Sequence, residues 1–234
     1  MKRGRRSKEP MTKEQIEKKK KKIIKRFIII VAIIILAIIA YIANDFIILD
    51  KNEKTNLVIN NNNITSNIKN DILIENDIIY LSKQDIANFF DKYIYEEKEN
   101  NKIITTYDKK IASFGIEGNT ININGSDQKI YANAKKEDDT IYLPISEKKD
   151  VYGIEIQNIK ESKVITIDST SKEQKKAMVS SDSAIKATTK FIAKTIDRVK
   201  KGSYVVVVSK TDDGWTKIRT ENGKVGFIKS KNLV

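Results

Sequence analysis

The apolar stretch at positions 27–49 constrains this chain more than any other feature. Its first part, 27–43, runs for 17 residues without a charge or a strongly polar side chain. As a helix this part is about 25 Å long and the whole stretch about 35 Å, enough to cross a bilayer core of about 30 Å. A buried core helix is the alternative, but such a helix carries one polar stripe and this stretch has none. The sequence therefore predicts a transmembrane helix at 27–49, with Asn44 and Asp45 at the far interface.

The flanking charge predicts the orientation of that helix. Segment 1–26 carries 13 Lys/Arg and 3 Asp/Glu, whereas the far flank begins with Asp45, Asp50 and Lys51. Because basic flanks stay on the cytoplasmic side, we expect the N-terminus inside and the C-terminal domains outside. A cleavable signal peptide fits less well, because its apolar region spans only about 7–15 residues and a cut after Ala43 would place Tyr41 where a small residue is needed.

Basic residues next to the apolar stretch also suit anionic lipid. The membrane-proximal set is Lys18, Lys19, Lys20, Lys21, Lys22, Lys25 and Arg26. A juxtamembrane cluster of this kind is attracted to negatively charged headgroups. We therefore expect membrane lipid, and not nucleic acid, as the partner of this set.

Composition excludes several kinds of chemistry. The chain has no cysteine and no histidine. Disulfides, thiolate and histidine metal sites, and every Ser-His-acid arrangement are thereby excluded. Only an all-carboxylate active site stays open, and the acid pairs Glu96-Glu97 and Asp138-Asp139 are more typical of solvated loops than of a glycosidase. We expect no catalytic residue, no metal and no cofactor.

Segment 50–168 contains one pattern twice. The first copy has short strands at 57–60, 71–75, 77–82 and 102–107. A short helix is predicted to begin at Ser82, with Asp85 three residues on as in a capping box, and to bury Ile86, Phe89 and Phe90. The order recurs about 62 residues later: Ile121-Asn122 repeats Ile59-Asn60, Asp139–Leu143 repeats Asp77–Leu81, Val151-Tyr152 repeats Phe89-Phe90, and Val164–Thr166 repeats Ile103–Thr105.

The second copy departs from the first at its helix, where Pro144 follows the strand. Asn124-Gly125 predicts a hairpin turn, because both residue types tolerate positive φ. The string Ile141-Tyr142-Leu143-Pro144 before a short helix, and the same string with Ser82 in place of the proline, resemble the copper amine oxidase N-terminal-like domain of Gram-positive envelope proteins. We interpret this domain as a spacer or scaffold that holds the following domain away from the membrane. The resemblance implies no copper, since the usual ligands are missing.

The C-terminal part carries the most specific pattern. Segment 169–183 is rich in Ser and Lys and predicts an exposed linker. In 184–234, an opening strand at 184–194 is followed by strands at 203–210, 215–219 and 224–228, with Gly202, Asp213-Gly214 and Asn222-Gly223 at the turns. Short strands joined by tight turns over about 50 residues indicate a small closed barrel.

This order of motifs resembles a bacterial SH3-like (SH3b) domain. The resemblance implies binding to cell-wall material, usually peptidoglycan or associated anionic polymers. The candidate ligand contacts are Trp215, Tyr204 and Phe227, although Trp215 also suits the inner face of the barrel. Segment 169–234 carries 15 Lys/Arg and 6 Asp/Glu, a net charge of +9 against −6 for 27–168. Such a cationic domain would be attracted to the phosphates and carboxylates of wall polymers.

The complete order resembles the N-terminal, non-catalytic half of clostridial membrane-anchored family 18 glycoside hydrolases. Their acidic D-x-x-D-x-D-x-E signature is absent here. We expect a stand-alone relative, a truncated product or the front of a split protein. The predicted fold is one transmembrane α-helix, an α+β duplicated (strand-strand-helix-strand) domain and an all-β SH3-like barrel. The domains are predicted at 1–26, 27–49, 50–168, 169–183 and 184–234.

Three functional hypotheses follow. The first is a membrane-anchored protein that tethers to peptidoglycan or an anionic wall polymer. In the second, the chain is the anchoring and targeting half of a wall glycosidase whose catalytic barrel is absent. The third is a scaffold for another envelope protein.

Overall fold

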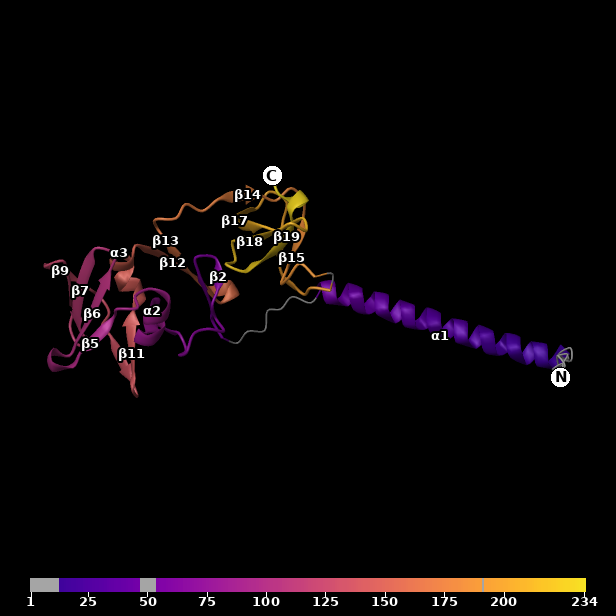
Figure 1. Ribbon diagram of the computed structural model, residues 1–234, viewed down its shortest axis with the longest axis horizontal. Coiled ribbons are helices and arrows are strands. Elements are labelled where there is room, and N and C mark those ends of the chain that lie inside the picture. Colours follow the sequence, from indigo (N-terminus) through magenta and orange to yellow (C-terminus); the bar gives the residue numbers. More distant parts are fainter. Residues whose placement is uncertain (1–12, 47–53, 191) are drawn as a thin grey trace, which may run out of the picture. The chain divides into compact units, whose positions relative to one another are not determined.

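The computed structural model describes residues 13–46, 54–190 and 192–234 (Figure 1). Parts of four predictions therefore lie outside the described residues: 1–12 of the basic segment, 47–49 of the apolar stretch, 50–53 of the duplicated segment and 191 of the strand expected at 184–194. The chain divides into two compact units, Met1–Ile47 and Ile48–Val234, and each is described by itself.

The first unit contains one long helix, α1 (Lys13–Phe46). Large apolar side chains lie exposed around its whole circumference, for example Phe27 at 65% and Leu36 at 65%. A helix that is apolar on every side is stable in a lipid environment, where its backbone hydrogen bonds are satisfied internally. Glu17–Ala40, with a mean hydropathy of 2.9, is long and apolar enough to cross a membrane.

The second unit begins with the duplicated domain, residues 56–169. Its regular elements are β1 (Asn56–Ile59), β2 (Asn62–Asn63), β3 (Leu73–Glu75), β4 (Ile78–Ser82), α2 (Lys83–Phe89), β5 (Tyr95–Glu97), β6 (Lys102–Tyr107), β7 (Lys110–Gly115), β8 (Thr120–Ile123), β9 (Ser126–Lys129), β10 (Lys135–Glu137), β11 (Thr140–Pro144), α3 (Lys149–Tyr152), β12 (Ile154–Ile159) and β13 (Val164–Ser169). They form three sheets, in the orders β12-β13-β1-β2, β10-β11-β4-β3 and β5-β6-β7-β8-β9.

The two copies meet through their equivalent central strands. β4 and β11 pair antiparallel with Leu81 opposite Leu143, two residues that the 62-residue repeat makes equivalent. On either side, Ser82 pairs with Tyr142 and Tyr80 with Pro144. This reciprocal pairing shows that a local two-fold axis passes between the two leucines. Both leucines are at most 2% exposed. The predicted duplication is therefore confirmed.

Helix and turn predictions in this domain are also confirmed. Ser82 caps α2 and accepts a hydrogen bond from the backbone N–H of Asp85 at 3.0 Å. In the second copy, Pro144 is followed by a 3₁₀ turn, Ile145–Lys148, and α3 is only 4 residues long. Asn124 and Gly125 have φ values of 51° and 86° between β8 and β9. Positive φ at both central positions defines the type I′ hairpin turn.

The second unit ends with the barrel domain, residues 176–234. Its strands are β14 (Lys176–Met178), β15 (Ser183–Lys186), β16 (Thr195–Val199), β17 (Tyr204–Lys210), β18 (Trp215–Arg219) and β19 (Val225–Lys229). They form a six-stranded sheet in the order β14-β17-β18-β19-β15-β16. Its core consists of the buried residues Val179, Ile185, Val199, Val205, Ile218 and Ile228. The predicted SH3-like barrel and its glycine turns at Gly202, Gly214 and Gly223, all with positive φ, agree with this structure.

Two details differ from the sequence-based expectation. Segment 169–183, expected to be an exposed linker, contributes β14 to the barrel sheet and the fully buried Val179 to its core. Only three residues pair there, too few to show a strand period. The opening strand expected at 184–194 ends at Lys186, and the chain returns as β16 from Thr195. Ile192, which suggested strand, is 70% exposed in the intervening loop.

Candidate functional site

Strand alternation gives the barrel domain one face that points away from its core. In β18, Thr216 and Ile218 are fully buried. Trp215, which precedes Thr216, and Lys217, which lies between the two buried residues, are half-buried. Because successive side chains in a strand point to opposite faces, Trp215 lies on the outer face. The inner-face alternative for Trp215 is therefore wrong.

β19 extends this outer face. Phe227 lies directly opposite Lys217, and Lys229 directly opposite Trp215. On the other side of β19, Lys186 of β15 pairs with Phe227. We call this set, Lys186, Trp215, Lys217, Phe227 and Lys229, the cationic face.

A cation–π contact organises the cationic face. The Lys229 ammonium nitrogen lies 3.9 Å from the centroid of the Trp215 ring. The Lys186 ammonium donates a hydrogen bond to the Thr195 hydroxyl at 3.0 Å. Two aromatic rings flanked by three lysines offer a stacking surface together with positive charge. Such a combination suits an anionic polymer that also carries apolar or sugar faces.

Packing beneath the cationic face leaves no room for a side chain at Gly226. A Cβ there would lie 2.6 Å from Ile196 Cδ1 and 2.7 Å from both Ile185 Cγ2 and the Lys186 carbonyl oxygen. The backbone of β19 therefore lies directly against β15 and the core, which fixes the spacing between Lys186 and Phe227.

Two acidic residues, Asp212 and Asp213, lie in the turn that precedes Trp215. The Thr211 hydroxyl donates a hydrogen bond to the Asp213 carboxylate, and this bond is the main cause of the lowered pKa of Asp213. Asp213 is consequently ionised at neutral pH. We expect it to limit the positive potential at that end of the cationic face.

Tyr204, the third candidate, lies elsewhere. It begins β17, is 56% exposed and pairs with Met178 of β14. Val206, two residues on, pairs with Arg219 at the far end of β18 from Trp215. At about 3.3 Å per residue, Tyr204 is roughly 15–20 Å from Trp215. The structure thus brings Trp215 and Phe227 together and separates Tyr204 from them.

The membrane-proximal basic set lies within α1. Lys18 pairs with Glu14 at 2.8 Å and Lys21 with Glu17 at 3.5 Å, both across one helical turn. The side chains of these pairs are about 70–80% exposed, so the pairs leave the ammonium groups in solvent. Consecutive lysines on a helix point in all directions around the axis. The set therefore forms a basic collar directly before the apolar part of α1.

The acid pairs considered from the sequence lie in the duplicated domain, outside the cationic face. Glu96-Glu97 is in β5, where Glu96 lies 3.6 Å from the Lys83 ammonium, and Asp138-Asp139 forms the turn between β10 and β11. Across residues 13–46, 54–190 and 192–234, no three Asp or Glu side chains come close enough to hold a metal ion.

Two features were not predicted from the sequence: an ion pair between the two domains and a buried lysine. Arg219 reaches from the barrel domain to Asp168 of the duplicated domain, and Lys148 is buried although its neighbours in the sequence are charged. Neither carries a local signal, because isolated charged residues at strand ends and in turns are normally solvated.

Taken together, the described structure consists of a helix long and apolar enough to span a membrane, a duplicated α+β domain and a cationic barrel. Residues 187–234 match the family model of the bacterial SH3 domain, and residues 58–167 match that of the copper amine oxidase N-terminal domain. The chain therefore contains these two domains in this order. Both are non-catalytic domains, and bacterial SH3 domains are in general cell-wall-binding.

Comparison with curated proteins gave no match. Among solved structures, the chain is similar to NlpC2 from Trichomonas vaginalis at 14% identity and a TM-score of 0.25, over 57% of this chain and 34% of that chain. It is similar to NlpC1 from the same organism at 11% identity and a TM-score of 0.25, over 60% of this chain and 40% of that chain. The chain thus covers well under half of either protein, and a TM-score of 0.25 is too low to show a shared fold.

Proposed function

We propose that this chain is a single-pass membrane protein whose extracytoplasmic barrel domain tethers it to the cell wall through the cationic face. The observation that carries the proposal is the grouping of Trp215, Phe227 and Lys229 on the outer face of a bacterial SH3 domain. Peptidoglycan and its associated polymers offer carboxylates, phosphates and sugar faces. The lysines would attract the anions, and the rings would stack on the sugars.

Anchoring would strengthen this weak contact. α1 would hold the barrel domain next to the membrane, so that wall binding becomes an intramolecular event at high effective concentration. The basic collar would remain on the cytoplasmic side in contact with anionic lipid. The duplicated domain would act as the spacer between membrane and wall.

Orientation is tested by protease accessibility in cells stripped of wall with the membrane intact. We expect a C-terminal epitope tag to be cleaved and an N-terminal tag to be protected, because the basic collar precedes α1. Protection of the C-terminal tag would place both domains in the cytoplasm and end the wall proposal.

Wall binding is tested by co-sedimentation of the full chain in detergent micelles with purified wall. The double variant Lys217→Met/Lys229→Met is expected to reduce retention at low salt on the order of tenfold, since it removes two lysines of the cationic face. The matched control is Lys200→Met/Lys201→Met, which removes the same charge from the exposed turn before β17. Retention of wild type should fall with salt more steeply than that of the first variant. Equal losses in both double variants would show that net charge alone binds the wall and that the cationic face is not the site.

A further inference from the structure

The barrel domain and the duplicated domain are held together by specific contacts. Arg219 Nη1 donates to Asp168 Oδ1 at 2.8 Å, Nη2 lies 2.7 Å from Asp168 Oδ2, and Nη2 also donates to Gln174 Oε1 at 3.0 Å. The side chains of Arg219 and Asp168 are only 8% and 14% exposed. Two parallel charge-assisted hydrogen bonds fix both the distance and the angle between their partners.

The turn between β18 and β19 completes this contact. Asn222 accepts a hydrogen bond from the Ser162 hydroxyl through its backbone carbonyl at 2.7 Å. At Gly223 a Cβ would lie 2.7 Å from Val164 Cγ1 and 2.9 Å from Ile159 Cδ1. Only glycine therefore allows the turn to lie this close to the duplicated domain. The crevice that remains beside these contacts is a defined feature of the fold.

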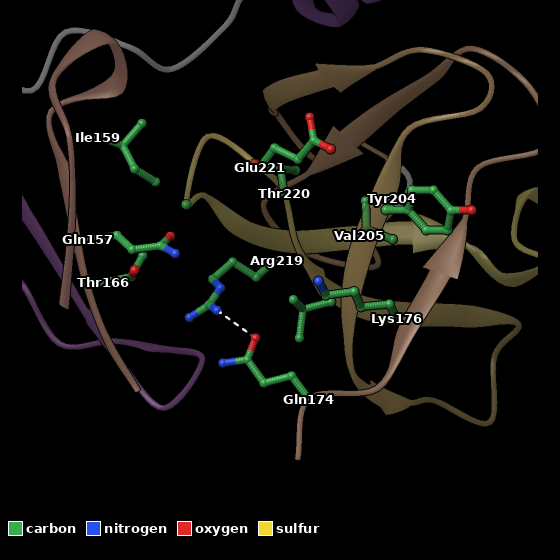
Figure 2. Close-up of a pocket in the computed structure, with 12 residues that line it drawn as sticks. Gln157, Ile159, Thr166, Gln174, Lys176, Tyr204, Val205, Arg219, Thr220 and Glu221 are labelled. Carbon is green, nitrogen blue, oxygen red and sulfur yellow. Dashed lines mark hydrogen bonds between the residues drawn. The ribbon is translucent and has the colours of Figure 1, made fainter. Parts of the chain in front are cut away.

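That crevice, which we call the interdomain groove, has a volume of about 240 Å³ (Figure 2). Gln157 of β12 and Thr166 of β13 form one wall, and Lys176 of β14 and Tyr204 of β17 the other. Arg219 lies between the two walls, and Glu221 lies beyond it in the turn after β18 (Figure 2). The groove thus has hydrogen-bonding groups on both sides and an aromatic ring on one.

Three polar side chains that line the groove are already hydrogen-bonded: Arg219, Gln174 and Thr220, the last of which donates to Asp197 at 2.7 Å. In the part of the chain that the structure describes, the side chains of Gln157, Thr166, Lys176, Tyr204 and Glu221 make no hydrogen bond or ion pair. Thr166 is only 2% exposed, yet it lines the groove. Its hydroxyl is not a fully buried unpaired atom, so it is reached through the groove and is available to a ligand there.

The charges select the kind of ligand. Arg219 is neutralised by Asp168, which leaves one cation, Lys176, and one anion, Glu221. A neutral sugar would leave both unpaired, whereas a zwitterion would pair both. Amide and hydroxyl groups such as those of Gln157 and Thr166 match the donor and acceptor of a peptide bond. At about 240 Å³ the groove lies just below the range of drug-sized pockets, about 300–1,000 Å³, and so fits a short ligand.

We propose that the interdomain groove binds a short peptide with a free amino end and a free carboxylate end. Glu221 would pair with the ammonium, Lys176 with the carboxylate, and Gln157 and Thr166 with the intervening peptide bonds, while Tyr204 covers a small apolar side chain. This site is separate from the cationic face, and it does not depend on the wall-tethering proposal.

Isothermal titration of the full chain in detergent micelles tests the groove. The probes are trialanine with free ends, N-acetyl-trialanine, trialanine amide and the disaccharide N,N′-diacetylchitobiose. We expect trialanine to bind, and each capped peptide to bind about tenfold more weakly or worse, because one charge pair is lost. Glu221→Gln should remove the preference for the free amino end, and Lys176→Met the preference for the free carboxylate.

Matched controls are Glu155→Gln and Lys200→Met, exposed residues that do not line the groove. They should leave both preferences intact, and retention on purified wall should be unchanged in all four variants. The inference is overturned if trialanine gives no binding heat up to about 10 mM, a concentration that detects even millimolar affinity. It is equally overturned if the disaccharide binds more tightly than trialanine, or if Glu221→Gln and Lys176→Met leave the end preferences as they are.

Discussion

Replacing Lys148 by methionine is expected to stabilise the duplicated domain by about 3 kcal/mol at pH 7. Lys148 is only 1% exposed, and its ammonium nitrogen has no hydrogen-bond partner. It lies 4.1 Å from the centroid of the Phe114 ring, a contact too weak to replace full hydration. Burial lowers the pKa of Lys148 from 10.5 to about 8, despite the opposing charge of Glu147. A shift of this size corresponds to about 3 kcal/mol of cost for keeping the amine charged.

The pH dependence has a definite sign. In the unfolded chain Lys148 keeps its proton up to about pH 10.5, whereas in the folded chain it loses it near pH 8. Below pH 8 both states carry the proton, so the full penalty on folding is present. Between pH 8 and pH 10.5 the unfolded state binds more protons than the folded state. The free energy of unfolding therefore rises with pH over this range, until the cost of burying the charged amine has disappeared. The advantage of the methionine variant should therefore be largest below pH 8 and vanish by about pH 10.5.

Urea unfolding of the full chain in detergent micelles at pH 7 and at pH 10 measures this difference. Near-UV circular dichroism follows the duplicated domain through the packed rings of Tyr107 and Tyr152, whose centroids lie 5.3 Å apart. Lys149→Met is the matched control, because its side chain is exposed one residue along. A methionine variant less stable than wild type at pH 7 would show that the ammonium is well solvated or paired in solution, contrary to its position here.

Lys148 also illustrates what a local pattern does not reveal. The run Glu147-Lys148-Lys149-Asp150 is typical of a solvated turn, yet the 3₁₀ turn after β11 directs Lys148 into the core. The 62-residue repeat makes Lys148 equivalent to Ile86, which is fully buried in the first copy. The burial of this position therefore follows from the repeat and not from the charged residues beside it.

Features defined by local chemistry or by repetition were predictable. The equivalence of Leu81 and Leu143 follows from the repeat, and the hairpin at Asn124-Gly125 follows from its positive-φ residues. Trp215 and Phe227 share a face because of strand register, which their turns imply. The link between Asp168 and Arg219 was out of reach, since the two residues are 51 positions apart and each alone looks like a surface charge. β14 was not predicted because its three residues are too few to show a strand period.

Asp168→Ala is the second substitution with a large expected effect. It would leave the Arg219 guanidinium at the domain boundary, 8% exposed, with Gln174 as its remaining partner among the residues that the structure describes. Removing one member of a buried ion pair costs about 3–5 kcal/mol, because the other charge loses both water and counter-ion. Replacing both members, as in Asp168→Leu/Arg219→Met, should cost much less. Asp71→Ala is the control, since the 2.9 Å pair with Lys54 is about three-quarters exposed and its loss should matter little.

The location of the Asp168–Arg219 pair predicts a change in cooperativity as well as in stability. Trp215 is the single tryptophan, so its fluorescence follows the barrel domain, whereas near-UV dichroism of the tyrosines follows mainly the duplicated domain. In wild type the two urea transitions should coincide, and in Asp168→Ala they should separate. Because the interdomain groove exists only while the domains stay together, Asp168→Ala should also weaken trialanine binding and leave wall retention unchanged. Coincident transitions in the variant would mean that the turn at Asn222-Gly223 suffices to join the domains, and that the ion pair serves only the barrel.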